Sequence, residues 1–338
     1  MATIKDVAKL AQVSATTVSL ILNGKSEERR ISPATREKVL AAMNELGYQP
    51  NLSARRLRAN DAKKPTIAFY WPIDYRTNIL ASFLNSFQNR VKELDFECEL
   101  VIQTYENDHL EANAEPIIRN SYNAVIIGAT TEKDMEFLNT LDPQMPVVLI
   151  NRMADKFSSV CINTEETGML AARLFRQKGY TEAAILASAR PYMATGLRTQ
   201  AFIKACSQLG IRVDQDWILL DQGTISGGVQ AAKNYCRLYN PPKAIFCDSD
   251  AIAIGAVYTF NQHNIRMPED VELLSIGMLD PESTEYTVPS ISIIIMPNNK
   301  VMASAVDIVK EAIQTSNLAP VHIDISPEVI MRESFTEK

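Results

Sequence analysis

Residues 3–23, TIKDVAKLAQVSATTVSLILN, predict two short helices joined by a tight turn. Thr3 and Asp6 have the spacing of a capping box, with Asp in place of Glu, at the start of the first helix. The apolar residues of this helix recur on one face: Ile4, Val7, Ala8 and Ala11. Gln12 and Val13 form the turn, and Ser14 caps a second helix whose inward-facing residues are Val18, Ile21 and Leu22. Two helices joined by so short a turn cannot bury a core alone, so a third helix is required.

The third helix is predicted at residues 32–46. Ser32 and Pro33 provide an N-cap and a proline at the first helical position, and Gly47 ends the helix. Its apolar stripe consists of Val39, Leu40, Met43 and Leu46. Together the three helices predict a helix-turn-helix head, and a small helical bundle with no role in DNA binding is the alternative for this segment alone.

Charge separates this head from the rest of the chain. Residues 1–64 carry 12 Lys and Arg against 6 Asp and Glu, a net charge of +6. The whole chain holds 34 and 40, so the remaining residues hold 22 against 34, a net charge of −12. A basic head on an acidic body is expected where only the head meets phosphate. The candidate phosphate contacts, some of which are expected only to face solvent, are Lys5, Lys9, Lys25, Arg29, Arg30, Arg36, Arg55, Arg56 and Arg58.

The length of 338 residues suits a small head and a body of about 270 residues. The chain lacks a signal-peptide pattern and an apolar run long enough to cross a membrane, so we expect a soluble, cytoplasmic protein associated with the nucleoid. The five cysteines are scattered and odd in number, which favours reduced core residues over disulfides or a zinc site. Neither a Walker loop nor a GxSxG or GxGxxG motif occurs, so we expect no enzyme activity, no cofactor and no metal.

From Thr66 onward, short apolar runs alternate with amphipathic helical patterns. The expected strands are 66–71, 99–103, 124–128, 147–151, 160–163, 183–187, 217–220, 244–247 and 272–277. The expected helices between them include 79–94, 164–178, 198–209, 228–238 and 250–263. This alternation predicts an α/β fold with mainly parallel strands and helices on both faces. The body is longer than one doubly wound unit, so we expect two parallel-sheet subdomains with a ligand near the carboxyl ends of the strands.

The segment between head and body has a pattern of its own. Between Pro50 and Pro65, residues 51–58 have the pattern of one or two helical turns, which is too short to be stable alone in water. We expect this hinge helix to form only against DNA or a dimer partner. A flexible linker is the alternative.

Six motifs follow one another at characteristic positions: TIKDVAKLAQVSATTVSLILNG (3–24), ISPATREKVLAAMNELGYQPN (31–51), ARRL (54–57), RTQAF (198–202), DSDAIAIGA (248–256) and MPEDVELLSIG (267–277). In this order and spacing, the chain resembles the LacI/GalR family of bacterial transcription regulators along essentially its whole length. The resemblance implies a homodimer or dimer of dimers that binds a near-palindromic, double-stranded DNA operator. It also implies a small-molecule effector, a sugar or sugar derivative, held between two periplasmic-binding-protein-like subdomains.

The resemblance also implies the domain boundaries. Residues 1–48 are the helix-turn-helix domain, 49–64 the hinge helix and linker, and 65–338 the effector-binding and dimerisation domain. Within the last, the N-subdomain spans about 65–162 and 294–321, and the C-subdomain about 163–293 and 322–338.

For DNA binding, the resemblance lays the second helix in the major groove with Ala15, Thr16 and Leu20 nearest the base edges. Residues that contact the DNA backbone or position the helix are Ser14, Thr17, Ser19 and Asn23, with further phosphate contacts from Thr3, Ser32, Thr35 and Tyr48. In the hinge, the DNA-binding residues are Asn51, Ala54, the minor-groove wedge Leu57, and Arg58 along the groove. Many relatives carry arginine at Leu20, so this apolar set favours thymine methyl groups over guanine. Packing is the alternative role for Leu20.

For the effector, Arg198, four residues before Phe202, matches the clamp for sugar hydroxyls or purine. The other matched positions are Asn151, Gln222, Ser249, Asp250 and Leu279, with Trp71, Asp74, Tyr192 and Asn298 lining the cleft or lying in core or surface. Asp250 serves equally as an N-cap. Leu279 stands where many sugar-binding relatives have an aspartate, which removes an acceptor for hydroxyls and weakens the case for a neutral sugar.

The function these features favour is a sequence-specific repressor of carbohydrate uptake or catabolism genes, controlled by an effector in the cleft. Control by a protein corepressor, with the cleft weak or unused, is the alternative within the family. A stand-alone solute-binding module or a small-molecule enzyme is the alternative outside it. The basic head argues against the first of these and the missing catalytic constellation against the second.

Overall fold

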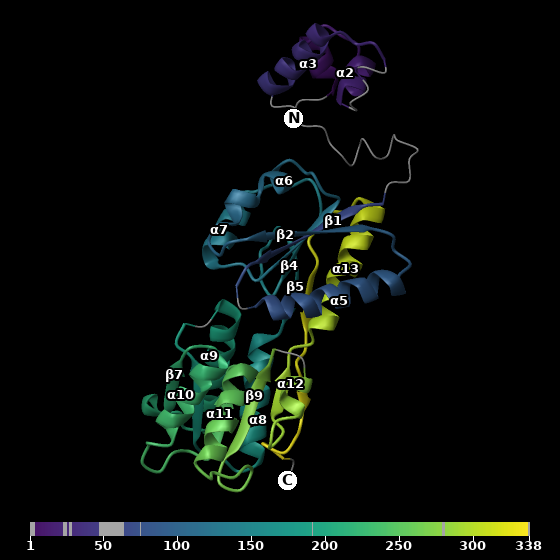
Figure 1. Cartoon of the computed structure of the whole chain (residues 1–338). Helices are drawn as coiled ribbons and strands as arrows, with labels where there is room; N and C mark the ends of the chain where they lie inside the picture. Colours follow the sequence, from purple (N-terminus) through teal and green to yellow (C-terminus); the bar gives the residue numbers. More distant parts are fainter. Residues whose placement is uncertain are drawn as a thin grey trace.

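The computed structural model describes residues 4–22, 26, 29–46, 64–74, 76–190, 192–278 and 281–336. Within these residues the chain forms a small helical head and an α/β body with two six-stranded sheets (Figure 1). The predicted fold class is confirmed. The predicted hinge helix falls on residues outside the described ones.

The head consists of three helices: α1 (Ile4–Leu10), α2 (Ala15–Leu22) and α3 (Pro33–Glu45). Between α1 and α2 the backbone of Gln12 has a φ of 54°, which makes the predicted tight turn. The Thr17 N–H donates to Ser14 Oγ at 3.0 Å, and the Thr35 N–H donates to Ser32 Oγ at 3.2 Å. Both predicted serine caps are therefore present.

A small apolar core joins the three helices of the head. Its buried side chains are Val7, Ala8, Ala11, Val18, Ile21, Val39 and Ala42. The prediction that Leu40 and Leu46 belong to the apolar stripe is wrong, because their side chains are 42% and 36% exposed. Leu40 directly follows Val39 and so faces about 100° away from it around the helix. Leu46 is the C-cap of α3 and lies past its last turn.

The first subdomain is built on a parallel sheet. Its strands are β1 (Thr66–Pro72), β2 (Glu99–Tyr105), β3 (Ala124–Gly128), β4 (Val147–Ile150), β5 (Ser158–Ile162) and β11 (His322–Ile325). They lie in the order β11-β5-β4-β3-β1-β2, with every pair parallel. One face is covered by α5 (Thr77–Glu93) and α13 (Asn298–Thr315), and the other by η1 (Leu110–Asn113), α6 (Glu115–Ile118) and α7 (Glu132–Thr140) (Figure 1).

The second subdomain repeats this plan. Its strands are β6 (Ala183–Ser188), β7 (Ile218–Asp221), β8 (Ala244–Cys247), β9 (Glu272–Gly277), β10 (Ser292–Ile295) and β12 (Glu328–Ile330), in the order β12-β10-β9-β8-β6-β7. Only β12 is antiparallel to its neighbour among these strands. The helices are α8 (Thr164–Gln177), α9 (Met193–Gln208), η2 (Gln215–Trp217), α10 (Ile225–Tyr235), α11 (Asp250–Gln262) and α12 (Glu282–Glu285).

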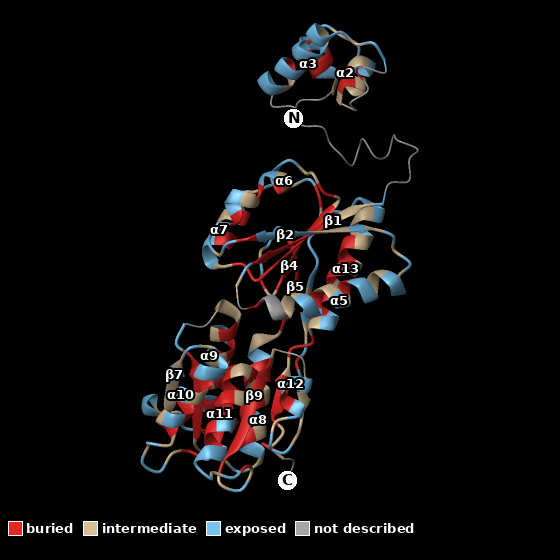
Figure 2. Ribbon diagram, viewed as in Figure 1, coloured by how far each residue is buried: buried red, intermediate tan, exposed pale blue. Residues whose placement is uncertain are grey.

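Packing in the second subdomain uses both faces of its sheet. Helices α8 and α9 pack on one face and α10 and α11 on the other, so the central strands β6, β8 and β9 are buried throughout (Figure 2). Helices α10 and α11 approach closely at Gly255, where a Cβ atom would lie 2.1 Å from the carbonyl oxygen of Ile225. Only glycine tolerates so close a backbone.

In the described body, the chain crosses between the subdomains after β5, after β10 and after β11. The boundary expected between residues 321 and 322 assigns β11 to the second subdomain. Instead, β11 pairs with β5, Ile323 opposite Val160, and belongs to the first sheet. Strand β10, expected to belong partly to the first subdomain, pairs with β9 in the second sheet. The second crossing therefore lies at Met296 and Pro297.

The strand order in each sheet reverses beside its first strand, β1 in one sheet and β6 in the other. In open α/β sheets ligands bind outside the carboxyl ends of the strands at such a reversal. The loops after β1, β3, β4, β6, β8 and β9 are therefore the places to look for a site. No helix of the described residues is long and apolar enough to cross a membrane.

Candidate functional site

The second helix of the head, α2, presents the residues expected to read DNA. Ser14, Ala15 and Thr16 are exposed, and Thr17, Ser19 and Leu20 are half-buried. The Ser14 and Thr17 hydroxyls lie 2.9 Å apart, and those of Ser32 and Thr35 lie 2.8 Å apart, so all four hydroxyls gather at the starts of α2 and α3. Leu20 is not among the described apolar side chains that form or pack against the head core. The expected DNA contacts Thr3, Asn23, Tyr48, Asn51, Ala54, Leu57 and Arg58 lie outside the described residues.

A pocket lies where the carboxyl ends of the strands of both sheets meet. The space between its lining residues is about 620 Å³ when the open mouth is included. From the first subdomain it is lined by Trp71, Arg76, Ile79, Phe83, Ala129, Ile150, Asn151 and Arg152. From the second subdomain and the start of α13 it is lined by Tyr192, Ala194, Thr195, Arg198, Met278, Met296 and Asn298.

Five of the expected effector residues line this pocket: Trp71, Asn151, Tyr192, Arg198 and Asn298. Asp74 lies beside it through its contact with Arg76. Leu279 is outside the described residues. Arg76 and Arg152 also line the pocket, but they were not predicted from the sequence. Arg152 could have been predicted, because it directly follows Asn151 at the carboxyl end of β4, where ligands bind in open α/β sheets.

Four expected effector residues do not line the pocket. Phe202 is fully buried one helical turn beyond Arg198 and stacks on Phe246 with the ring centroids 4.2 Å apart. Gln222 is exposed after the edge strand β7. Ser249 is the N-cap of α11, and its Oγ accepts from the Ile252 N–H at 3.5 Å.

Asp250, the fourth of these residues, supports the pocket from behind. Its Oδ1 accepts from the Ala251 N–H at 3.0 Å, and its Oδ2 accepts from the Met278 N–H at 2.8 Å. Met278 itself lines the pocket. The alternative that Asp250 is the N-cap of α11 is wrong, because Ser249 has that position; the carboxylate of Asp250 binds within the first turn of α11 and fixes the loop after β9.

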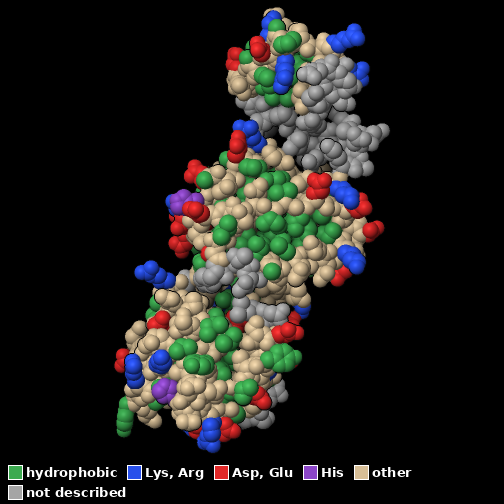
Figure 3. Space-filling model, viewed as in Figure 1, with side chains coloured by type: hydrophobic (Ala, Val, Ile, Leu, Met, Phe, Trp, Pro, Cys, Tyr) green, Lys and Arg blue, Asp and Glu red, His purple; other side chains and the backbone are tan. Residues whose placement is uncertain are grey.

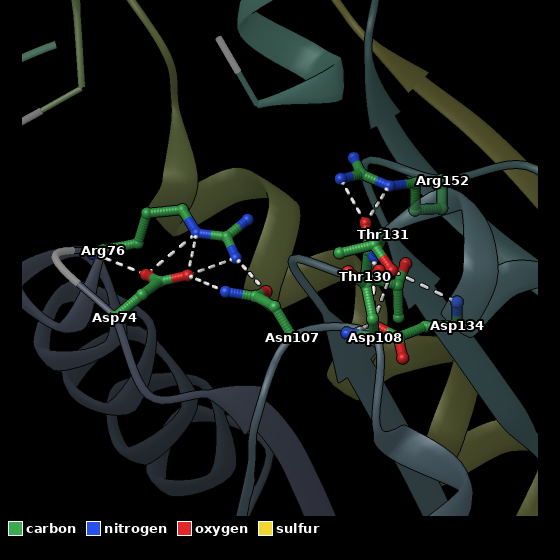
Figure 4. A network of polar contacts seen from close by, with 8 residues as sticks. All are labelled: Asp74, Arg76, Asn107, Asp108, Thr130, Thr131, Asp134 and Arg152. Atoms are coloured by element: carbon green, nitrogen blue, oxygen red, sulfur yellow. Dashed lines mark hydrogen bonds and ion pairs between the residues drawn. The ribbon is translucent and has the colours of Figure 1, made fainter. Parts of the chain in front are cut away.

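Arg76 is held in a network that Figure 4 shows. Its Nε donates to both carboxylate oxygens of Asp74 at 3.0 and 2.9 Å, and its Nη2 donates to Asn107 Oδ1 at 3.0 Å. Burial opposes ionisation of Asp74, but hydrogen bonds from Arg76 and Asn107 outweigh it and hold the pKa of Asp74 below its ordinary value. The guanidinium also lies 3.7 Å from the ring centroid of Tyr192, so this contact joins the two subdomains.

Arg152 binds backbone carbonyls. Its Nε and Nη2 donate to the Thr130 carbonyl at 2.8 and 2.6 Å, and its Nη1 donates to the Asn151 carbonyl at 2.6 Å. The next residue after Thr130 starts α7 with a capping box between Thr131 and Asp134, which fixes this loop (Figure 4). Burial first, and the charge of Arg76 second, lower the pKa of Arg152 to about 10.

Arg198 projects from α9 and is 5% exposed. Its Nη1 donates to Met278 Sδ at 3.7 Å, a weak acceptor, and its Nε has no hydrogen-bond partner among the described residues. Burial, with the charge of Arg152, lowers the pKa of Arg198 to about 10, against the opposing effect of Asp248. Burial also raises the pKa of Asp248 to about 6, although the Ser188 N–H donates to it at 2.8 Å.

The arrangement has the chemistry of a binding site. Apolar walls carry a few convergent donors, and two buried donors, Trp71 Nε1 and Arg198 Nε, have no acceptor among the described residues. Such a site suits a small molecule with acceptor groups and an apolar face. No group of His, Cys, Asp or Glu in the described parts of the chain has the arrangement of a metal site.

Comparison with known proteins agrees with this combination of head and body. The model of bacterial regulatory proteins of the lacI family matches residues 3–51, and that of the periplasmic binding protein-like domain matches residues 172–335. The HTH-type transcriptional repressor PurR of Vibrio vulnificus is 30% identical over 343 residues, which cover 99% of this chain and 98% of that repressor.

Solved structures of LacI family regulators are also similar to this chain. A LacI family transcription regulator from Clostridium acetobutylicum is 34% identical with a TM-score of 0.76, over 80% of this chain and 100% of that one. The lac repressor dimer bound to operator and the anti-inducer ONPF has a TM-score of 0.68 at 20% identity, over 99% of each chain, and shows the shared fold. The chain is therefore a member of the LacI family of bacterial transcription regulators, a repressor with a DNA-binding head and an effector-binding body and not an enzyme.

Proposed function

We propose that this repressor binds a near-palindromic operator as a homodimer, and that a small molecule in the pocket sets its affinity for that operator. The observation that carries the proposal is a pocket lined from both subdomains, with buried donors that lack partners among the described residues, in a chain with a helix-turn-helix head. The controlled genes serve the uptake or catabolism of a carbohydrate derivative. Asn151, Thr195 and Asn298 supply the polar side chains that hydroxyl groups require. Such a protein acts at the nucleoid, in the cytoplasm.

The reading surface of the head is small and apolar. Ala15 and Thr16 are exposed on α2, and Leu20 is outside the head core, so these three side chains are free to meet base edges. Alanine, threonine and leucine offer methyl groups, which favour contact with the thymine methyl over bidentate contact with guanine. We therefore propose that α2 contacts A·T base pairs at the centre of each operator half-site.

Exposed apolar residues on the edge strands of the two sheets support the proposed homodimer. Strands β2 and β7 each form one of the two edges of their sheets, and each carries an exposed apolar residue, Ile102 at 37% and Leu220 at 48%. Ile225, at the start of the adjacent α10, is also exposed. Figure 3 shows hydrophobic side chains gathered on one face of the first subdomain. An isologous dimer covers such edges and presents two heads to a two-fold-symmetric operator.

Effector control follows from the position of the pocket. Tyr192 and Arg198 belong to the second subdomain, and Arg76 and Arg152 to the first, so a ligand between them changes how firmly the subdomains close on each other. A ligand that prefers one closure shifts the population toward it, and DNA affinity changes by no more than this preference. Control by a protein corepressor through an unused cleft is less favoured, because an unused cleft has no need of buried donors without partners.

The experiment begins with genome-wide mapping of bound sites, which supplies an operator for fluorescence anisotropy titrations. The bound sites should share a two-fold-symmetric motif, and log affinity should fall linearly with log salt. Leu20→Ala should weaken operator binding, whereas Leu40→Ala, a matched change at an exposed leucine of α3, should leave it unchanged. A missing symmetric motif, or an affinity independent of salt between about 50 and 200 mM, would refute the proposal.

A further inference from the structure

Buried arginines are a distinctive feature of the pocket. Arg76, Arg152 and Arg198 all line it, and each is less than a tenth exposed. Arg76 is paired with Asp74. Arg152 donates to the carbonyl oxygens of Thr130 and Asn151, and Arg198 donates to the thioether sulfur of Met278.

The described carboxylates near the pocket make no ion pair with Arg152 or Arg198, although the charges of Asp134 and Asp248 attract these arginines. Asp134 accepts from the Leu110 N–H at 3.1 Å and from the Thr131 N–H at 3.1 Å. Asp250 accepts from the Met278 N–H. Asp248 is held by the Ser188 N–H, and no ion pair links it to Arg198 within the described residues. Among the described residues, the buried guanidinium groups of Arg152 and Arg198 therefore have no carboxylate in contact with them.

These two guanidinium groups come from opposite sides of the pocket. Arg152 follows β4 of the first subdomain, and Arg198 projects from α9 of the second. They are close enough for the charge of Arg152 to lower the pKa of Arg198. Like charges buried together are unfavourable, and a single anion between them would compensate both. The planar guanidinium suits the oxygens of a carboxylate or a phosphate in particular.

The other residues that line the pocket indicate the character of the uncharged part of the ligand. Trp71, Ile79, Phe83, Met278 and Met296 form an apolar wall, and the indole N–H of Trp71 has no acceptor in the part of the chain that the structure describes. A ligand with a charged end and a less polar body would meet both parts of this surface. A neutral sugar would leave the two guanidinium charges without a counter-ion.

We propose that the pocket binds an anionic small molecule, whose carboxylate or phosphate lies between Arg152 and Arg198 and whose remaining part packs against the apolar wall. This inference rests on the proposed function only in that the pocket is the effector site. It narrows the sugar or sugar derivative expected by resemblance to a sugar acid, a sugar phosphate or an anion of similar size.

The test uses matched pairs of compounds with the full-length protein. Thermal shift is measured with galacturonate and galactose, gluconate and glucose, glucose 6-phosphate and glucose, and inorganic phosphate alone, and each positive is followed by isothermal titration calorimetry. At least one acid should raise the melting temperature while its neutral partner does not. The carboxylate and phosphate arms identify which anion the pocket takes.

Variants then locate the site. Arg152→Met and Arg198→Met should each lower the affinity for the positive acid at least tenfold, and Arg198→Lys should lower it less. Arg212→Met is the matched control, since Arg212 is exposed and pairs with Glu182 and Asp214 outside the pocket. The melting curve of each variant without ligand establishes whether it folds. If a methionine variant does not fold, the affinity of Arg198→Lys is measured in its place.

Three results would overturn the proposal: a neutral compound that binds as tightly as its acid, affinities unchanged by both methionine substitutions, or no shift from any acid of the panel, inorganic phosphate included. A different result would refute the proposed function. An acid that binds at the arginines yet leaves operator affinity unchanged at saturation would refute effector control by that site but leave the anion site intact.

Discussion

Replacing Asp248 by Asn should stabilise the second subdomain at neutral pH. Asp248 lies at the carboxyl end of β8, is 1% exposed, and accepts one hydrogen bond from the Ser188 N–H through Oδ2. Its Oδ1 has no partner among the described residues. Burial therefore raises the pKa of Asp248 to about 6 from an ordinary value of 3.8, even though the hydrogen bond from the Ser188 N–H and the charge of Arg198 act in the opposite direction.

The raised pKa fixes the sign of the effect. Between pH 4 and pH 6 the folded protein binds a proton at Asp248 that the unfolded chain has released, so this group stabilises the fold below its unfolded pKa. The contribution is lost as pH rises through about 6. The difference between the two pKa values corresponds to about 3 kcal/mol. Asn keeps the acceptor for Ser188 and carries no charge, so it should recover up to about 3 kcal/mol at pH 7.5.

The assay is urea unfolding, followed by far-UV circular dichroism, of the wild type and Asp248→Asn from pH 4 to pH 8. The variant should be equal to the wild type near pH 4 and more stable by up to about 3 kcal/mol at pH 7.5. Asp216→Asn, a matched change at an exposed residue of η2, should show no such trend. A variant less stable than the wild type at pH 7.5 would refute the reasoning, because Asp248 would then be an essential counter-charge for Arg198.

Three further predictions concern other parts of the chain. Lys178→Met should lower the free energy of unfolding by about 3 kcal/mol in urea, because it leaves the carboxylate of Glu272, 3% exposed, without its ammonium partner; an unchanged stability would contradict this. Gly255→Ala should cost about 1–3 kcal/mol by overpacking against the Ile225 carbonyl, and a melting temperature equal to the wild type would disprove the close approach. Leu20→Ala should reduce operator affinity about tenfold in anisotropy titrations, the loss of one apolar base contact. A melting temperature lowered by several degrees would instead assign Leu20 to the core.

The strands that the sequence could predict are those with buried apolar runs on both faces. The segments 124–128, 244–247 and 272–277 agree with β3, β8 and β9 residue for residue, because every residue of these strands is buried. Strands β10, β11 and β12 were not among the predictions. They are three or four residues long, and their pairing depends on distant partners, such as Ile323 opposite Val160 and Val329 opposite Ile294. Local pattern carries too little information for such strands.

The pocket could be predicted only in part for a similar reason. Arg198, Tyr192 and Asn151 were found by resemblance, position by position. The ion pairs of the pocket arginines could not be predicted, because they depend on which carboxylate contacts which arginine in the folded chain. Asp74 engages Arg76 two residues away, whereas Arg152 turns to the carbonyl of Thr130, and no spacing in the sequence distinguishes these outcomes. Phe202 shows the opposite error, since a residue one turn from a ligand contact on the same helix can lie entirely in the core.

One contact and one charge repulsion act between the two subdomains across the pocket. The Arg76 guanidinium over the Tyr192 ring favours closure without a ligand, by about 0.5–2 kcal/mol. Arg152 and Arg198 oppose closure while no anion separates them, because each brings a buried positive charge toward the other. An anion that reaches both arginines only when the cleft is closed binds the closed form better by definition. This difference in affinity, and not the total binding energy, limits how far the ligand can change operator binding, and a shift from 1:99 to 99:1 requires about 5.5 kcal/mol of it.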